Sequence, residues 1–255
     1  MGSVSVKETE PIELAPGVWR AGTALVNWYL VEDGGSVAIV DAGCPRFRPQ
    51  LDRALERMGR SLGDVMAVVL THAHADHVGF AEPLREETGV AVHVHSDDEQ
   101  LATTRKPFGK NERSILADLR HPHAYRLLGH LLRNGLAKVE PIEVVTTFED
   151  GATLDVPGAP RVVHTPGHTM GHCSLLFGDK GALVVGDAIC TLNPVTGNRG
   201  PQLMPRSFNL SSGKCLDSLA KLQEIEAEVA LPGHGEPWRD GVAAAVEQAR
   251  AAGAS

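Results

Sequence analysis

One feature constrains this chain more than any other: the six consecutive residues His72-Ala73-His74-Ala75-Asp76-His77. They follow the apolar run Val65–Leu70, whose shortness and β-branched side chains predict a buried strand. His72 and His74 are two residues apart, so in extended backbone they point to the same side. Asp76 and His77 fall at the turn into the next predicted helix and can point toward the same cavity. The loop therefore favours a metal site over a merely His-rich polar loop.

Three later loops repeat this arrangement, each with a potential ligand after a predicted strand. In the segment 164–172 a Pro-Gly turn holds His168 away from the backbone. His164 and His172 compete for the same role, and we expect each to be a buried hydrogen-bonding residue. Asp187 follows an apolar strand, where an acid is costly unless it is paired or metal-bound. His234 lies in a Pro-Gly-His-Gly turn. Each loop alone is weak evidence, but together the four loops supply five histidines and two aspartates.

This set of nitrogen and oxygen donors suits two divalent metal ions. The four cysteines show no C-x-x-C spacing, so a thiolate site is not indicated. The donors point to Zn²⁺, with Fe or Mn as alternatives. A structural zinc site is usually closed by four ligands rich in Cys. The seven residues here supply about three ligands per ion and one shared carboxylate, which leaves room for water. We therefore expect a catalytic centre.

Composition bounds the remaining functions. The chain has 255 residues, 42% of them hydrophobic and 22% charged, as in a globular protein able to bury a full core. Its net charge of −8 argues against a nucleic-acid partner. It has no apolar run of about 18 residues for a membrane span, and Met1–Glu10 lacks the features of a signal peptide. We expect a cytoplasmic protein with reduced, mostly buried cysteines and a small-molecule substrate, and a homodimer stays open.

The order of the predicted elements indicates an α/β protein. Short strands over residues 17–41, with a hairpin turn at Asp33-Gly34-Gly35, precede alternating helices and strands. Further strands are predicted at 65–70, 90–95, 144–148, 153–156, 161–164, 173–177, 182–185 and 229–231. Helices are predicted at 48–58, 78–88, 211–225 and 242–251. The segment 190–205 reads as a loop that lines the substrate pocket.

Residues 96–136 form a predicted helical insertion with a basic, polar break at 105–111. Pro122 begins its second helix, which carries an apolar stripe made of Leu127, Leu128, Leu131 and Leu132. The insertion is either a helical hairpin packed on the core or a wall of the pocket above the metals that controls substrate choice. We expect its histidines to be surface or packing residues; they are His121, His123 and His130.

With these motifs in view, the chain resembles the metallo-β-lactamase-fold hydrolase superfamily, which includes glyoxalase II, over residues 13–240. The resemblance implies a four-layer αββα sandwich with the metals at one edge between the sheets, in a single domain of residues 1–255 with the helical insertion near 96–136. By motif position, the first metal ion would be bound by His72, His74 and His168. The second would be bound by Asp76, His77 and His234, and Asp187 would bridge the two. Asp41, in Val40-Asp41-Ala42-Gly43, matches the family's Asp-x-Gly and would support the ligands.

No branch of that superfamily matches in full. Its β-lactamases are exported, and one major class has Cys at the position of Asp187. Glyoxalase II has a sizeable C-terminal helical domain, whereas 21 residues follow His234 here (255 minus 234). Acyl-homoserine lactonases place a Tyr three residues after the bridging Asp, where this chain has Cys190. Persulfide dioxygenases use one iron and differ at the last His motif.

We therefore expect a dinuclear metal-dependent hydrolase of a small ester, thioester or lactone, with phosphoesters less favoured. A hydroxide held between the ions would be the nucleophile, and Asp76 would orient it and help to move its proton. Two alternatives remain open. One is a mononuclear iron dioxygenase acting on a persulfide or thiol, and the other is a catalytically silent metal-binding sensor or interaction protein.

Overall fold

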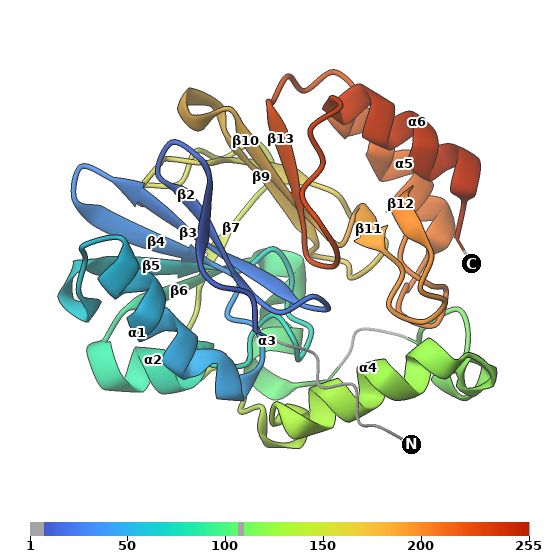
Figure 1. Cartoon of the computed structure of the whole chain (residues 1–255), viewed down its shortest axis with the longest axis horizontal. Coiled ribbons are helices and arrows are strands. Elements are labelled where there is room, and N and C mark those ends of the chain that lie inside the picture. Colours follow the sequence, from blue (N-terminus) through green and yellow to red (C-terminus); the bar gives the residue numbers. More distant parts are fainter. Residues whose placement is uncertain (1–7, 107–109, 255) are drawn as a thin grey trace.

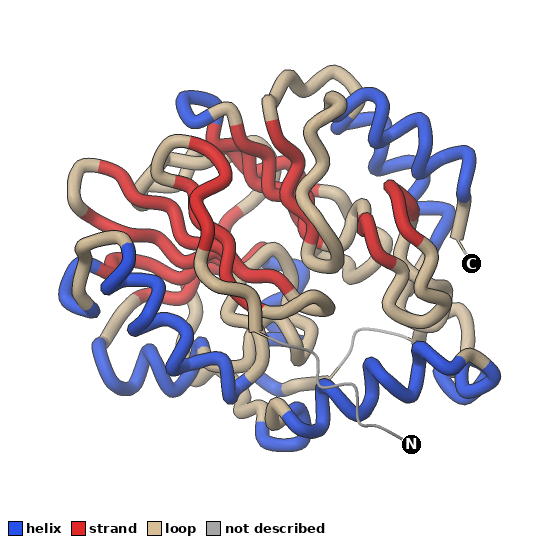
Figure 2. Tube along the Cα trace, viewed as in Figure 1, coloured by secondary structure: helices blue, strands red, loops and turns tan. Residues whose placement is uncertain are grey.

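Two β-sheets pack face to face, and helices cover the outer side of each (Figures 1 and 2). The computed structural model describes residues 8–106 and 110–254. The first sheet runs in chain order through β1 (Ile12–Ala15), β2 (Val18–Gly22), β3 (Asn27–Asp33), β4 (Ser36–Val40), β5 (Val65–Val69), β6 (Ala91–His95) and β7 (Thr146–Phe148). The second has the order β13 (Val229–Pro232), β10 (Ala182–Gly186), β9 (Cys173–Phe177) and β8 (Arg161–His164). A separate hairpin pairs β11 (Cys190–Leu192) with β12 (Arg199–Gln202).

The helices begin and end at residues suited to those positions. They are α1 (Arg48–Arg57), α2 (Ala81–Thr88), α3 (Glu99–Thr104), α4 (Pro122–Arg133), α5 (Ser212–Leu222) and α6 (Val242–Ala252). Proline occupies the first turn of α1 and of α4, where its missing N–H has no partner to lose. The hydroxyl of Ser211 accepts from the Lys214 N–H and caps α5. Gly89 ends α2 in the left-handed conformation.

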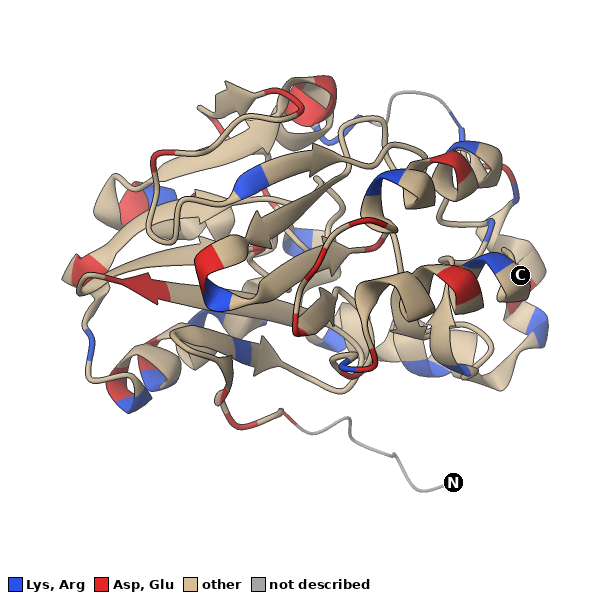
Figure 3. Cartoon of the chain, turned by 90° about the horizontal axis from the view of Figure 1, so that it is seen from above, with Lys and Arg blue, Asp and Glu red and all other residues tan. Residues whose placement is uncertain are grey.

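Successive apolar side chains on each strand point to opposite faces of the sheet, and this alternation builds the layers. In β3, Trp28 and Leu30 face the helices, whereas Tyr29 and Val31 face the second sheet. In β10, Val184 faces the first sheet, while the two residues beside it join the outer core with α5 and α6. Figure 3 shows Lys, Arg, Asp and Glu mainly on helices and loops, with most of the strand length uncharged. Both faces of both sheets are therefore covered, as a four-layer sandwich requires.

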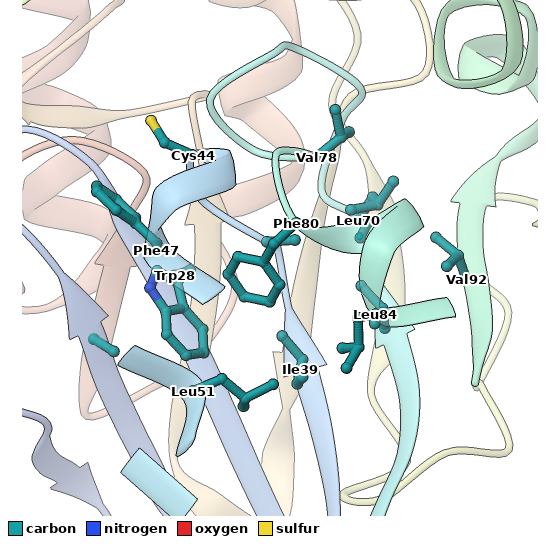
Figure 4. Close-up of a cluster of buried hydrophobic side chains, with 14 of the residues drawn as sticks. Trp28, Ile39, Cys44, Phe47, Leu51, Leu70, Val78, Phe80, Leu84 and Val92 are labelled. Atoms are coloured by element: carbon teal, nitrogen blue, oxygen red, sulfur yellow. The ribbon is translucent and has the colours of Figure 1, made fainter. Parts of the chain in front are cut away.

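Figure 4 shows part of the hydrophobic core that lies between the first sheet and the helices outside it. Trp28 and Phe80 meet there edge to face, with ring centroids 5.2 Å apart. Phe47, Leu51 and Leu84 fill the space between the sheet and the helices α1 and α2. Phe80 comes from the loop that follows His77, so the packing of this core also fixes the far end of the predicted metal loop.

The predicted α/β class is confirmed, and most predicted elements lie within a few residues of the observed ones. The Asp33-Gly34-Gly35 turn joins β3 to β4, and both glycines have positive φ. All four cysteines are free and buried. Among the described residues, no helix has both the length and the apolar character needed to cross a bilayer.

Two predicted segments and one predicted helix start are wrong for physical reasons. Residues 153–156 are not a strand, because only Thr153 bridges to β8. The segment 190–205 is not a loop throughout, because it contains the β11–β12 hairpin. Helix α2 begins at Ala81 rather than Val78, because the N–H groups of Gly79 and Phe80 bond across to the carbonyls of Gly43 and Ala42. Strand β1 was not expected.

The insertion 96–136 is helical, as predicted, with α3, the 3₁₀ segment Ile115–Arg120 and α4. Residues 107–109 of its basic break lie outside the described residues. The predicted apolar stripe is only half correct. Leu127 and Leu131, four residues apart, are buried in the core with Phe47, whereas Leu128 and Leu132 are 42% and 54% exposed.

This difference gives a matched pair of stability predictions. Leu127→Ala should lower the free energy of unfolding by about 2–3 kcal/mol, because it leaves a cavity under α4. Leu128→Ala, on the exposed side of the same helix, should change it by less than about 0.5 kcal/mol. Chemical denaturation of the two variants measures this. Equal effects would mean that α4 does not pack on the core through its Leu127 face.

Candidate metal centre

The potential ligands lie on loops that leave the carboxyl ends of parallel strands. Asp41 follows β4 and the segment His72–His77, called the metal loop below, follows β5, its parallel neighbour. Asp187 follows β10, and His234 follows β13, again a parallel pair. His168 comes from the turn between β8 and β9. The carboxyl ends of both pairs meet at one edge of the sandwich, where loop residues of both sheets converge.

The buried carboxylate of Asp187 stands at the centre of this group. The Nε2 atoms of His168 and His234 each lie 3.2 Å from its Oδ2. The Nε2 of His72 lies 3.9 Å from the same oxygen, and the Nε2 of His77 lies 3.8 Å from Oδ1. Four imidazoles thus turn the same ring nitrogen toward one carboxylate.

The other two predicted ligands complete two sides of the cluster. His74 points its Nδ1 at the Nε2 of His168, 2.8 Å away. Two ring nitrogens this close repel each other unless a proton or a cation lies between them. Asp76 places Oδ2 3.7 Å from the Nε2 of His234. All seven residues singled out from the sequence therefore come together, with potential donor atoms within 4.8 Å of one another in three overlapping sets: His72, His74 and His168; His72, His77 and Asp187; Asp76, His77 and His234.

Hydrogen bonds on the outer ring nitrogens fix the tautomers. In each of four imidazoles the Nδ1–H donates outward: His72 to Thr71 Oγ1 at 3.0 Å, His77 to Asp41 Oδ2 at 2.9 Å, His168 to Asn209 Oδ1 at 3.0 Å and His234 to the Leu25 carbonyl at 2.5 Å. The acceptor role of Thr71 follows because its hydroxyl proton is already donated to Asp41. Each Nε2 is therefore the ring atom that faces the centre, and its lone pair would bind a metal ion once the ring is neutral. Without a metal ion, the effect of burial is outweighed by nearby carboxylate charges, chiefly that of Asp187, which raise the pKa of His77 to about 10 and also raise the pKa of His234.

Three atoms at the centre test whether these residues fit divalent ions. Nε2 of His72, Nε2 of His77 and Oδ1 of Asp187 are buried and have no hydrogen-bond partner among the described residues. Such orphaned polar atoms are destabilising in a protein interior, and a bound cation removes the penalty. Burial lowers the pKa of His72 and of His74, which keeps these imidazoles neutral. The donor set thus fits metal ions with nitrogen and oxygen ligands.

Asp41 supports the metal loop, as expected. It adopts a left-handed backbone conformation with φ of 60°, unusual for a residue with a side chain. Its Oδ1 accepts from the Thr71 N–H at 2.8 Å, and its Oδ2 accepts from His77. One carboxylate therefore holds both ends of the segment that carries the ligands.

Asp98 is a site residue that the sequence did not reveal. It is 2% exposed, and its two oxygens accept from the Ala73 N–H at 3.0 Å, the Thr169 hydroxyl at 2.8 Å and the Gly171 N–H at 2.8 Å. Ala73 lies inside the metal loop, and Thr169 follows His168. Asp98 thus ties two ligand loops together from the 3₁₀ segment Ser96–Asp98 that precedes α3. In the sequence it is one of three consecutive acids, and no local pattern distinguishes it.

Asp98→Asn should weaken both the fold and metal binding. An amide offers one oxygen and turns an N–H₂ toward a donor, so at least one of the three bonds is lost. We expect the free energy of unfolding to fall by about 2 kcal/mol and metal affinity to fall by about tenfold. Metal titration and denaturation measure the two effects. Asp97→Asn, on a 53% exposed neighbour, is the matched control and should leave both unchanged; equal effects would argue against the tie.

The two competing histidines have structural partners. His172 is fully buried, donates from Nδ1 to Thr165 at 2.9 Å, and accepts from the Asp187 N–H at 2.9 Å. It therefore positions Asp187 from behind. His164 donates to the Met170 carbonyl at 2.7 Å and stacks on the ring of His95, at 4.0 Å between centroids. Both residues form the predicted hydrogen bonds, but only His172 is buried, because the side chain of His164 is 18% exposed.

Two histidines of the insertion, His130 and His123, lie outside the His/Asp cluster. His130 is buried and pairs with the Thr23 hydroxyl at 3.2 Å. His123 lines a cavity of about 160 Å³ beside Gly235, the residue after His234.

The sandwich and the His/Asp cluster at its edge are those of the metallo-β-lactamase fold. A sequence profile of the Metallo-beta-lactamase superfamily matches residues 21–234, and the chain belongs to this superfamily. It is 29% identical to the probable metallo-hydrolase YflN of Bacillus subtilis (strain 168), over 93% of this chain and 90% of that protein. It is 26% identical to the probable metallo-hydrolase YqjP of the same organism, over 87% of this chain and 70% of that one.

Solved structures agree with this assignment. The metallo-beta-lactamase family protein TTHA1429 of Thermus thermophilus superposes with a TM-score of 0.65 at 27% identity, covering 92% of this chain and 79% of that one. A Cronobacter sakazakii metallo-β-lactamase with a HARLDQ motif superposes with a TM-score of 0.68 at 22% identity, over 97% and 93% of the two chains, which is a likeness of fold alone. The family and the four-layer fold predicted from the sequence motifs are confirmed.

Proposed function

We propose that this protein is a dinuclear metal-dependent hydrolase of a small ester, thioester or lactone. The observation that carries the proposal is the position of Asp187, whose buried carboxylate lies between two groups of imidazoles and keeps one oxygen without a hydrogen-bond partner among the described residues. A site for a single structural ion needs no such shared carboxylate.

The donor groups divide between two ions around that carboxylate. His72, His74 and His168 would hold one ion, Asp76, His77 and His234 the other, and Asp187 both. Nitrogen and oxygen donors without thiolates favour Zn²⁺. When bound, such ions lower the pKa of water toward neutrality and polarise a carbonyl group.

Asp76 is the chain's own group for handling the proton. Its side chain is 17% exposed, whereas Asp187 is 2% exposed, so Asp76 lies on the open side of the cluster. A carboxylate there can accept a hydrogen bond from the attacking water, orient its lone pair toward the scissile carbonyl, and pass the proton to the leaving oxygen or sulfur. Cys190, three residues after Asp187, is unsuited to nucleophilic attack, because burial raises its thiol pKa well above the usual value.

A substrate screen on metal-defined protein tests the proposal. Ester, thioester and lactone substrates are assayed with the two-zinc protein, with dissolved oxygen followed in parallel. We expect hydrolysis of at least one class without oxygen uptake, lost on chelation and restored by Zn²⁺. Oxygen consumption by a one-iron form would instead favour a thiol or persulfide dioxygenase. Inactivity toward all three classes at full metal loading would contradict the proposal.

A further inference from the structure

An unusual arginine stands beside the metal loop. Arg105 ends α3 in the left-handed conformation, with φ of 58°, where α2 has a glycine. For a residue with a side chain this conformation costs about 1 kcal/mol. Among the described residues three non-glycine residues have positive φ, and two of them, Asp41 and Arg105, bond to the metal loop. The backbone strain thus coincides with the candidate site.

The guanidinium of Arg105 makes one hydrogen bond, and most of its N–H donors remain available to a ligand. Its Nη1 donates to the Ala73 carbonyl at 2.8 Å, and this is its only hydrogen bond within the described part of the chain. Ala73 lies between His72 and His74, so the cation touches the metal loop itself. Burial lowers the pKa of Arg105, whereas the charge of nearby Asp76 raises it. The bond to Ala73 thus places the guanidinium beside the metal loop, within range of the Asp76 charge.

Other partly buried arginines of this chain are neutralised directly. Arg20 pairs with Glu236 at 2.7 Å, Arg48 with Asp52 at 2.7 Å and Arg85 with Glu82 at 2.7 Å. For Arg105 no carboxylate oxygen lies within 4 Å among the residues that the structure describes. A half-buried cation without an ion pair is energetically unfavourable, and a ligand anion would relieve that cost.

We infer that Arg105 binds a carboxylate of the substrate, so that the ester, thioester or lactone hydrolysed here carries an anionic group close to the scissile bond. The inference rests on the proposed hydrolase function. A single guanidinium, presenting two parallel N–H groups, matches one carboxylate, whereas a phosphate dianion is normally held by several cations or a backbone cradle.

A second cationic region is the alternative place where a substrate carboxylate could bind. The 160 Å³ cavity beside Gly235 is lined by His123, Arg126 and Arg199 together with Glu236. Arg126 and Arg199 are exposed, and Glu236 already pairs with Arg20. The cavity thus offers cations at the surface, but none that is both half-buried and bonded to the metal loop.

Two esters of equal chain length test the inference. They are 4-nitrophenyl valerate, which is neutral, and the 4-nitrophenyl monoester of glutarate, which carries a terminal carboxylate. We expect the wild type to prefer the glutarate ester about tenfold in kcat/KM. Arg105→Gln should raise KM for this ester about tenfold, leave the valerate ester within about twofold, and keep the metal content unchanged. Arg105→Lys, which keeps the charge without the fork, should fall between. Arg57→Gln, on the exposed face of α1, is the control for net charge.

Three other outcomes would contradict the inference, and each can be told from the others. Equal losses on both esters with lost metal would mean that Arg105 only holds the Ala73 carbonyl. A selective loss in Arg126→Gln would place the anion in the cavity. Stronger competition by inorganic phosphate than by glutarate, abolished in Arg105→Gln, would overturn the choice of a carboxylate. If the wild type cleaves neither ester, the proposed ester hydrolysis fails independently of Arg105. Calorimetric binding of glutarate then tests the role of Arg105. The inference stands if Arg105→Gln abolishes this binding, and it falls if the binding is unchanged.

Discussion

Asp187→Asn should lower turnover by about 10²-fold or more, which corresponds to about 3 kcal/mol in the activation barrier, while the chain stays folded. The carboxylate approaches two imidazoles through Oδ2 and keeps Oδ1 free at the centre of the described cluster. An amide preserves the shape but offers one neutral acceptor and no charge to hold two cations at short range. The second metal ion should therefore bind more weakly or at a shifted position, and the pKa of the bound water should no longer be lowered enough for attack.

Stability should not follow activity in this variant. Asparagine keeps the volume of the buried side chain, and much of the core lies away from this loop, so the fold should survive. Turnover, metal content and melting temperature are measured side by side, and the melting temperature is measured with and without a chelator. Two bound metals together with a near-native rate would show that Asp187 is not the shared carboxylate.

Three alanine variants in one loop should separate a ligand from its structural neighbours. His168→Ala should lose one metal ion and at least about 10³-fold in turnover, because its Nε2 faces both His74 and Asp187. His172→Ala should lose mainly stability, by about 2–3 kcal/mol, because the ring is fully buried and both its nitrogens are hydrogen-bonded. His164→Ala removes a partly exposed ring and should do least.

Metal analysis and denaturation of the three variants check this order. If His168→Ala keeps two metal ions while His164→Ala or His172→Ala loses one, the assignment of the loop is wrong. His172→Ala also serves as a control for indirect effects on the metal centre. It removes the acceptor of the Asp187 N–H but none of the atoms that face the metal ions.

The sequence was sufficient wherever a short segment determines its own structure. Short apolar or alternating runs located β3, β4 and β10, and Pro-Gly turns located the loops of His168 and His234. The seven clustered residues were identifiable because histidine and aspartate at strand ends are chemically unusual. The layers followed from the resemblance to a known fold, since a sequence alone does not state which sheets face each other.

Contacts between distant segments were the part that could not be predicted. Asp98 meets Thr169 across 71 positions, and Asn209 meets His168 across 41. Nothing near either residue indicates its partner. Arg105 was read as part of a basic break, because its left-handed backbone and its bond to Ala73 exist only in the folded chain. The β11–β12 hairpin was missed because its prolines and glycines resemble those of a loop. Leu128 and Leu132 fit an apolar stripe by spacing, yet the core ends at Leu127 and Leu131.

The number of metal ions per chain tests the central claim most directly. Elemental analysis after gentle purification, followed by titration with Zn²⁺, Mn²⁺ or Fe²⁺, measures it without any assumption about the substrate. Six donor residues around one shared carboxylate predict close to two ions per chain. A stoichiometry of one that none of the three added metals can raise would contradict the dinuclear centre.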